Sequence, residues 1–406
     1  MYLSQLKRIR FTIINKIFAR NLYNIKEIKQ NLNSVEIKWT DEKKVSNFNY
    51  IWLRDNCQCP LCIHSDSKQK LFLTSQVELD VKPINIDKDQ ETLKITWSSK
   101  SDSYHQSKYS FTFLRSFNQI KSLEHIKWNN SIIQSKNIWI KHDEYMNSDE
   151  KFFDSLKTLW KYGLLFIKDV PEKSDSIKNI VKRIGTLKYT FYGETFDVVS
   201  VPNAKNIAYT NLDLGLHMDL LYYEAPPGLQ FLHCLKNSVE GGYSIFADSF
   251  AAVDNFKSEY PLDYSLLTKI PITFHYMNNG HHMHYNRPMI EFDHFNNTFC
   301  VNYSPPFQGP IESLLDKNEN EIFKFYQAYN RFCLFIEDPN LKFNIKLKPS
   351  EMVIFMNRRV LHGRTSFNPQ SGERYLIGAY LELCEFKDKL RVLMRSFDEV
   401  NDLKEI

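Results

Sequence analysis

Short stretches in which apolar and polar residues alternate recur through this chain and favour a fold rich in β-strands. Residues 35–39 and 93–97 alternate with period two, and residues 164–167 form a short apolar run typical of a buried strand. From residue 207 onward, paired glycines and prolines separate further apolar runs. Apolar spacing predicts helices at 150–161, 175–184 and 321–335. We therefore predict a mainly β chain with helices, in the form of a barrel or sandwich.

The length of the chain predicts two domains. At 406 residues it exceeds the roughly 250–300 residues over which one hydrophobic core grows. We predict a small β-rich domain at 35–125 and a larger domain at 140–400, joined by a polar, irregular link at 126–148. No internal repeat of 20–50 residues is evident.

Basic residues are concentrated at the start of the chain. The first 26 residues hold six lysines and arginines and no acid, which leaves 46 basic against 48 acidic side chains in the remainder of a chain with net charge +4. Residues 1–30 are predicted to be a mitochondrial presequence that directs the protein to the matrix. A basic surface helix or frayed terminus is the alternative, with a cytoplasmic location. The near-neutral body argues against nucleic-acid binding, and no apolar run is long enough for a membrane span.

One pair of side chains has the spacing of metal ligands. His217 and Asp219 stand two positions apart, so in a strand they point to the same side. His362, about 140 residues later, offers a second imidazole. Two histidines and one carboxylate on one face of a metal ion are typical of non-haem Fe(II) oxygenases. The pair alone is weak evidence, because His64 and Asp66 repeat it, and a hydrogen-bonded core histidine is the alternative for His217.

Arg374 begins a strand-like run twelve residues after His362. Period two places Arg374 and Tyr380 on one face of that strand. A guanidinium beside the metal binds a carboxylate bidentately, which is what the iron enzymes that use 2-oxoglutarate need for the far end of that cosubstrate. Arg364 is the competing arginine, and a surface ion pair is the alternative for both.

Three thiols lie within six residues, at Cys57, Cys59 and Cys62. Such density indicates a metal, because thiolates bind Zn(II) tetrahedrally. The fourth ligand is His64, which would wrap the ion tightly, or His105, which would close a loop of about forty residues. Three reduced cysteines without metal are the alternative. A closed four-ligand site would be structural.

Several segments, in order, resemble the γ-butyrobetaine and trimethyllysine dioxygenases of carnitine biosynthesis over residues 35–400. The segments are residues 187–196, 206–210, 217–219, 226–228, 230–234 and 359–364. The resemblance implies a double-stranded β-helix (jelly-roll) oxygenase domain and a small N-terminal zinc-binding domain. It also implies Fe(II), 2-oxoglutarate as cosubstrate, structural Zn(II), ascorbate as reductant and a homodimer.

The resemblance assigns roles to individual positions. It implies that His217, Asp219 and His362 hold iron, that Arg374 anchors 2-oxoglutarate, and that His105 completes the zinc site. It also implies an aromatic cage for a trimethylammonium group, which aromatic faces hold through cation–π attraction. The cage is expected at Tyr192, Phe196, Tyr209 and Tyr380, where Phe196 replaces the family's common tryptophan.

The best-matching substrate is γ-butyrobetaine, hydroxylated to carnitine. Asn206 matches a position where the butyrobetaine enzymes use asparagine for the substrate carboxylate, and Asn302 is a second candidate. Hydroxylation of trimethyllysine, or of another small acid, is the alternative activity. The alternative that is not an enzyme is a binding or scaffold protein that keeps the barrel but has lost catalytic activity. The histidines at 281, 282 and 284 lie among turn residues, so we predict a solvated loop there.

Overall fold

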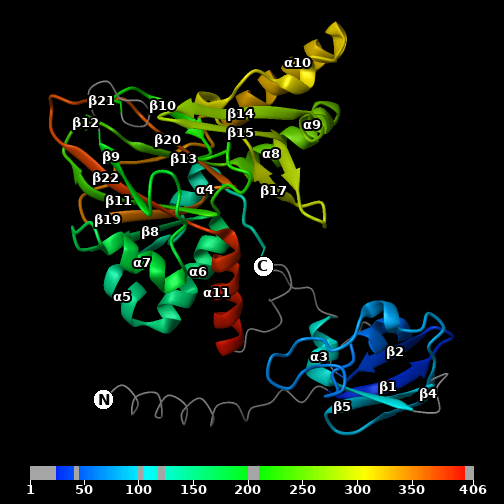
Figure 1. Cartoon of the computed structure of the whole chain (residues 1–406). Helices are drawn as coiled ribbons and strands as arrows, with labels where there is room; N and C mark the ends of the chain where they lie inside the picture. Colours follow the sequence, from blue (N-terminus) through cyan, green and yellow to red (C-terminus); the bar gives the residue numbers. More distant parts are fainter. Residues whose placement is uncertain (1–23, 41–44, 99–103, 118–123, 200–209, 398–406) are drawn as a thin grey trace. The chain divides into compact units, whose positions relative to one another are not determined.

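The structure is a computed structural model that describes residues 24–40, 45–98, 104–117, 124–199 and 210–397 (Figure 1). The chain divides into two compact units, Met1–Lys121 and Ser122–Ile406. Most of the predicted presequence lies outside the described residues, and residues 25–30 already form a strand of the small unit. In the described part of the chain, no helix is both long and apolar enough to span a membrane.

The small unit contains two antiparallel three-stranded sheets. The strands of the first are β1 (Ile25–Gln30), β2 (Ser34–Trp39) and β3 (Val45–Asn49), and those of the second are β4 (Pro83–Lys88), β5 (Thr92–Trp97) and β6 (His105–Ser110). The period-two alternation predicted for two of these strands is confirmed, because β2 and β5 bury every second side chain. Their buried faces, with Trp39 and Trp97, form the core of this unit.

The two halves of the small unit repeat one motif, which the sequence analysis missed. Each sheet leads directly into a short helix, α2 (Tyr50–Asp55) after β3 and α3 (Phe111–Ser116) after β6. The indole of Trp39 donates to Ser46, as that of Trp97 does to Ser107. The contacts across the halves are reciprocal, because Trp39 packs edge-on against Phe111 and Trp97 edge-on against Tyr50.

The large unit is a double-stranded β-helix, as predicted. Its described residues form a six-stranded sheet in the order β7-β8-β19-β11-β22-β9 and a four-stranded sheet in the order β10-β20-β13-β18. The first sheet comprises β7 (Trp139–Lys141), β8 (Leu164–Lys168), β9 (Thr195–Val199), β11 (Leu229–Asn237), β19 (Glu351–Met356) and β22 (Arg374–Leu381). The second comprises β10 (Leu214–His217), β13 (Ser244–Asp248), β18 (Phe343–Ile345) and β20 (Val360–Arg364). Apolar side chains from both sheets, such as Phe166 and Phe246, meet in one buried cluster.

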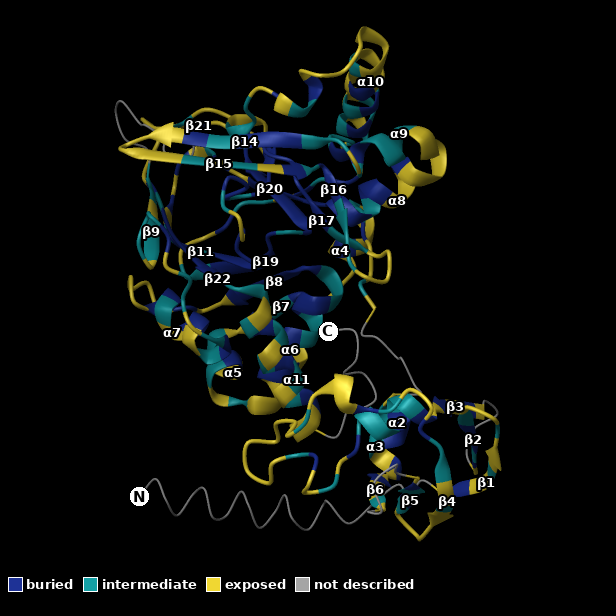
Figure 2. Cartoon of the chain, turned by 45° about the vertical axis from the view of Figure 1, so that its right-hand side comes forward, coloured by how far each residue is buried: buried dark blue, intermediate teal, exposed yellow. Residues whose placement is uncertain are grey.

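Helices cover the outer face of the six-stranded sheet (Figure 1). They are α5 (His142–Asn147), α6 (Asp149–Tyr162), α7 (Ser176–Ile184) and α11 (Leu383–Ser396). The helices predicted at 150–161 and 175–184 correspond to α6 and α7. Figure 2 shows that the strands are buried while these helices expose one side, as expected for amphipathic helices packed on a sheet.

An insertion between β13 and β18 forms the second lobe of this unit (Figure 1). It comprises α8 (Ser249–Glu259), α9 (Pro261–Leu267), β14 (Pro271–Asn278), β15 (His281–Pro288), β16 (Ile290–Phe292), β17 (Thr298–Val301) and α10 (Glu319–Ile336). The short strands β12 (Glu240–Gly241) and β21 (Phe367–Asn368) pair separately. The helix predicted at 321–335 corresponds to α10.

The predicted linker at 126–148 was wrong. This segment contains α4 (Asn130–Gln134), strand β7 of the main sheet and helix α5. Its few apolar side chains are widely spaced, yet Trp128, Ile133 and Tyr145 are each at most 1% exposed. Sparse anchors of this kind do not produce the periodic pattern by which strands and helices are predicted.

The predicted loop around the three histidines was also wrong, although their exposure was predicted correctly. His281, His282 and His284 belong to strand β15, which pairs with β14 in register along its length. Asn279 and Gly280 both have positive φ, as a two-residue hairpin turn of the Asn-Gly type requires. The turn residues therefore connect two strands, and do not begin a longer loop.

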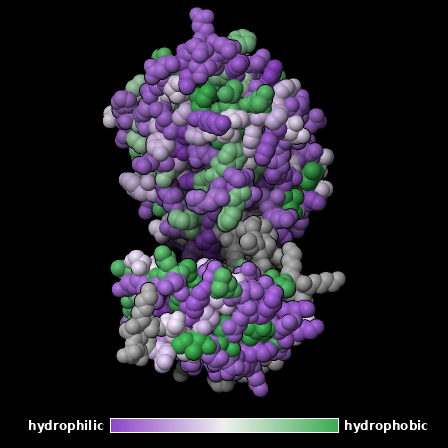
Figure 3. All heavy atoms as spheres, turned by 90° about the vertical axis from the view of Figure 1, so that its right-hand side faces the viewer, coloured by the Kyte–Doolittle hydropathy of each residue, from purple (hydrophilic) through white to green (hydrophobic). Residues whose placement is uncertain are grey.

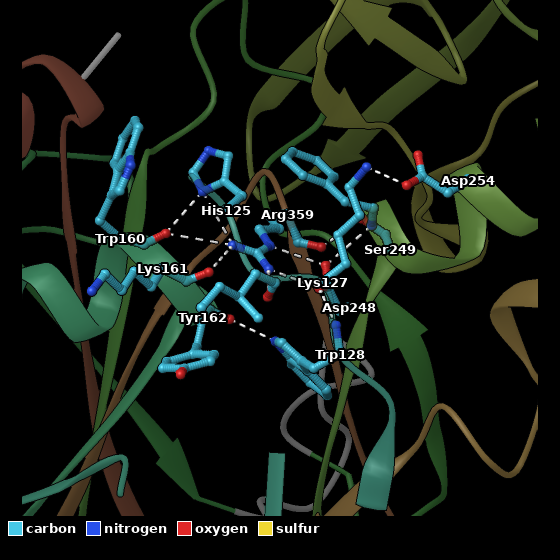
Figure 4. A network of polar contacts seen from close by, with 12 residues as sticks. His125, Lys127, Trp128, Trp160, Lys161, Tyr162, Asp248, Ser249, Asp254 and Arg359 are labelled. Atoms are coloured by element: carbon cyan, nitrogen blue, oxygen red, sulfur yellow. Dashed lines mark hydrogen bonds and ion pairs between the residues drawn. The ribbon is translucent and has the colours of Figure 1, made fainter. Parts of the chain in front are cut away.

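A buried ion pair ties four parts of the large unit together (Figure 4). Arg359 donates from Nε and Nη2 to the two oxygens of Asp248 at 3.0 and 2.8 Å, and both side chains are fully buried. Its remaining donors reach the carbonyls of Ile126 and Lys161, while Asp248 accepts from the backbone of Trp128. All the partners needed to offset desolvation of a buried pair are thus present.

We expect Asp248→Asn to destabilise the large unit strongly. The amide would leave the Arg359 guanidinium buried without its counter-charge, which typically costs about 3–5 kcal/mol in the free energy of unfolding. Urea unfolding measures the change. Glu373→Gln, which breaks the exposed pair with Lys236, is the control and should change stability little. Equal effects of the two substitutions would contradict the assigned importance of the buried pair.

Candidate metal centres and pocket

Strand pairing brings the predicted iron ligands together. His217 and His362 are direct partners in the antiparallel pair of β10 and β20, and their ring centroids lie 4.2 Å apart. Nε2 of His217 is 3.3 Å from Oδ1 of Asp219, and Nε2 of His362 is 3.8 Å from Oδ2. One ligand atom from each of the three side chains lies within 4.8 Å of the others. The arrangement can hold one metal ion and leave further positions open.

The protonation states of this cluster suit metal binding. Burial raises the pKa of Asp219, but the adjacent imidazoles of His217 and His362 outweigh it and hold the pKa well below its usual range. Burial, together with His217, lowers the pKa of His362 to about 3. Nδ1 of His217 lies 2.9 Å from the carbonyl of Gly215, which can only accept, so Nε2 keeps its lone pair. The carboxylate of Asp219 and the neutral imidazole of His362 are therefore available as ligands at neutral pH.

Asn357 positions the carboxylate ligand, and the sequence analysis did not identify it. Its Oδ1 accepts from the backbone N–H of Asp219 and its Nδ2 donates to the carbonyl of the same residue, both at 3.1 Å. Nδ2 also reaches the carbonyl of Pro227, and the side chain is fully buried. Asn357 thus fixes the backbone that carries the ligand. Its only sequence signal is that it precedes the 359–364 segment by two residues.

Tyr380 lies next to the metal cluster through its hydroxyl group. It donates to Oδ2 of Asp219 at 2.8 Å, so the second carboxylate oxygen already has a partner. Burial, and next the charge of Asp219, raise the pKa of Tyr380 well above its usual value, so that the hydroxyl keeps its proton. This tyrosine, predicted as a ring of the cage, is therefore also in contact with a predicted metal ligand.

Two buried arginines lie beside each other near the metal cluster. Arg374 begins β22 and is 9% exposed, and its Nε has no hydrogen-bond partner among the described residues. Burial and the nearby Arg364 lower the pKa of Arg374 to about 10. Arg364 instead donates from Nη2 to the carbonyls of Thr210 and Leu212. Because Arg364 is already bonded to two backbone carbonyls through Nη2, Arg374 is the better candidate to bind a carboxylate.

Three aromatic rings extend from the metal cluster toward the solvent. Phe196 stacks on Tyr380 with centroids 4.9 Å apart, and Tyr192 lies 6.0 Å from Phe196. The Tyr192 hydroxyl is 3.4 Å from that of Tyr222, a buried tyrosine three residues after Asp219 that the sequence analysis did not identify. The predicted cage residue Tyr209 and the predicted carboxylate partner Asn206 lie outside the described residues.

Asn302, the second predicted carboxylate partner, is fully buried. Its Nδ2 donates to the carbonyl of Pro288 and to Glu291, at 2.7 and 2.6 Å. Its Oδ1 accepts from the thiol of Cys300 at 3.1 Å. Both ends of this amide are therefore engaged within the protein.

The small unit contains a second cluster of ligand atoms. Nε2 of His105 lies 3.3, 3.7 and 3.6 Å from the sulfurs of Cys57, Cys59 and Cys62. His64 accepts instead from the backbone N–H groups of Asp66 and Ser67. Of the two histidines, the structure thus brings His105 to the thiols. Three sulfurs and one imidazole are a donor set that suits a closed tetrahedral zinc site.

Comparison with known proteins agrees with both parts of the chain. Residues 135–380 match the family model of taurine catabolism dioxygenase TauD, TfdA family, and residues 26–115 match that of gamma-butyrobetaine hydroxylase-like, N-terminal. Dioxygenase str8 of Strobilurus tenacellus is 36% identical and the alignment covers 84% of each chain. Gamma-butyrobetaine dioxygenase of Pseudomonas sp. (strain AK-1) is 31% identical, covering 89% of this chain and 94% of that one. Human mitochondrial trimethyllysine dioxygenase is 28% identical, covering 90% and 86%.

Asn357→Ala should weaken metal binding at the His217 cluster without removing a ligand. Outer partners of metal ligands typically contribute 10–100-fold to affinity, and loss of this amide frees the backbone of Asp219. Titration of metal-free protein with Co(II), followed by absorption, measures the affinity. Asn147→Ala, at an exposed site, is the control. Unchanged Co(II) affinity in Asn357→Ala would show that the backbone of Asp219 needs no such support.

Proposed function

This chain belongs to the TauD, TfdA family of Fe(II)- and 2-oxoglutarate-dependent dioxygenases, and from that premise we propose that it hydroxylates γ-butyrobetaine, a small trimethylammonium carboxylate, to carnitine. The observation that carries the proposal is one strand, β22. It presents Arg374 at one end, Tyr380 at the other, and between them Gly378, over which the ring of Phe196 lies. A cosubstrate anchor, a contact to a metal ligand and an aromatic wall therefore share one face.

The residues of the large unit fit the two groups that the family uses. His217, Asp219 and His362 would hold Fe(II), and the buried Nε of Arg374, which has no partner among the described residues, would receive the far carboxylate of 2-oxoglutarate. Together these groups supply the oxidant that inserts one oxygen atom of O₂ into a C–H bond, while 2-oxoglutarate is decarboxylated to succinate. The surrounding protein positions the substrate carbon and excludes water.

The aromatic rings provide the binding surface for the cation. A trimethylammonium group donates no strong hydrogen bond, so it is best held by aromatic faces, each worth roughly 0.5–2 kcal/mol. Tyr192, Phe196 and Tyr380 would form this wall, with Tyr209 as the fourth ring. Because the Tyr380 hydroxyl donates to Asp219, a cation on this ring is held next to the metal ligands. Asn206 is proposed for the substrate carboxylate, whereas the amide of Asn302, the second candidate, is already bonded within the protein at both ends.

Trimethyllysine is the second candidate substrate, because two relatives named trimethyllysine dioxygenase cover 89% and 90% of the chain, at 29% and 28% identity. The cation is the same, but trimethyllysine has a longer carbon chain and an additional amino group. Ascorbate as reductant, a location in the mitochondrial matrix and a homodimer complete the proposal. In the small unit, Cys57, Cys59, Cys62 and His105 would hold structural Zn(II).

Purified protein with Fe(II) and 2-oxoglutarate should release succinate when γ-butyrobetaine is added, and trimethyllysine should give a kcat/KM lower by about tenfold or more. His217→Ala should abolish this turnover, because it removes a metal ligand. His282→Ala, at an exposed position of β15, is the matched control. A preference for trimethyllysine would overturn the substrate, whereas full turnover in His217→Ala would overturn the iron site.

His105→Ala should lower the zinc content of the purified protein, whereas His64→Ala should not. Only His105 lies among the three sulfurs, and a structural zinc site contributes directly to folding. Metal analysis by mass spectrometry gives the content, and proteolysis of the small unit reports its stability. Equal zinc content in the wild type and His105→Ala would exclude His105 as a ligand.

A further inference from the structure

A second cavity lies in the large unit, away from the predicted iron ligands. Its volume is about 880 Å³, within the range of pockets that hold small organic molecules. It lies between α8, the loop from β16 to β17, α11 and the turn at 357–359. Neither the three residues of the metal cluster nor Arg374 line it. An occupant would therefore contact neither the predicted iron ligands nor Arg374.

Positive charges from three separate elements converge on this cavity, where Asp293 is the counter-charge that acts on Lys387. Lys257 of α8, Arg358 of the turn and Lys387 of α11 all line it, and none of the three forms an ion pair with a described residue. The buried Nε of Arg358 also has no hydrogen-bond partner in the described part of the chain. Donors from three separate elements thus face one space. Figure 3 views the side on which α8 and β17 lie, where hydrophilic side chains predominate.

Most of the acidic groups of the cavity are already engaged. Asp254 pairs with Lys127, as Figure 4 shows. Asp293 accepts hydrogen bonds from the backbone of its own loop, at Phe295 and Asn297. The remaining carboxylate, Glu124, is exposed. The lining therefore keeps an excess of positive charge.

Aromatic rings form part of the wall of the cavity. The charged end of each cation lies over an aromatic ring, at 5.2 Å for Lys257 over Tyr264 and 5.3 Å for Lys387 over Trp160. Arg358 lies 5.2 Å from the ring of Phe299 in the same way. Burial lowers the pKa of Lys387, and Arg391 lowers it further, as expected where like charges meet. A flat body between the rings, with anionic groups at its edge, would match both features.

We propose that this cavity is a second binding site, for a planar organic anion with at least two negative charges. Its anionic groups would pair with Lys257, Arg358 and Lys387, and its flat body would lie against the aromatic walls. Inorganic anions would satisfy the charges alone and leave most of the volume empty.

Naphthalene-1,5-disulfonate is a suitable probe, because it has two permanent charges and a flat body and neither reacts with lysine nor chelates iron. Calorimetry uses anaerobic full-length protein saturated with Fe(II) and 2-oxoglutarate, so that the iron site is occupied. We expect one probe bound per chain, with affinity that falls as salt rises. Inorganic sulfate and the uncharged 1,5-naphthalenedimethanol should each bind at least tenfold more weakly.

The variant Lys257→Gln/Lys387→Gln should weaken probe binding at least tenfold. Neither lysine forms an ion pair with a described residue, so the fold and the turnover should be unchanged. Lys389→Gln, on the same helix but outside the cavity lining, is the matched control and should bind like the wild type. Absence of probe binding, equal binding by the double variant, or displacement of the probe by excess 2-oxoglutarate would each overturn the proposal.

Discussion

The turn at 357–359, between β19 and β20, depends on the buried pair of Arg359 and Asp248. The pair has no exposed atoms, and the same guanidinium is bonded to carbonyls of Ile126 and Lys161, so the turn is fixed from several sides. Asn357, two residues earlier, holds both backbone groups of Asp219. The position of a predicted metal ligand is thus set by an ion pair that contacts no metal ligand itself.

The metal cluster follows from the register of two strands. Pairing of His217 with His362 places both imidazoles on one side of β10 and β20, and Asp219 follows where β10 has ended. Positive charge then accumulates along the neighbouring strand ends, where Arg364 and Arg374 are both buried. Two buried guanidinium groups side by side are costly without an anion. Asp213 supplies one negative charge near Arg364, and the proposed carboxylate of 2-oxoglutarate would supply another beside Arg374.

A feature of the fold or of the candidate site could be predicted from the sequence where neighbouring residues carry the pattern that indicates it. The alternation in β2 follows from the two-residue period of a strand and could be identified from the sequence. The same period led to the pairing of His217 with Asp219, but Asp219 lies in the turn after β10, so the strand that was expected to carry both ligands was wrong. The support from Asn357, the choice of His105 over His64 and the reciprocal packing of Trp39 on Phe111 join positions far apart in the chain. No local pattern encodes such contacts, because each depends on the tertiary fold.

The aromatic wall shows how a departure from the resembled enzymes is accommodated. The ring of Phe196 lies directly on Gly378, where a Cβ would come within 2.1 Å of its ring carbons. The same ring stacks on Tyr380, the next residue on that face of β22. Because Gly378 has no side chain, the ring of Phe196 has room to lie against it, and the ring of Tyr380 packs on the same ring. Any side chain at position 378 would collide with the ring at position 196. The two residues together therefore set the width of the proposed substrate site beside the aromatic wall.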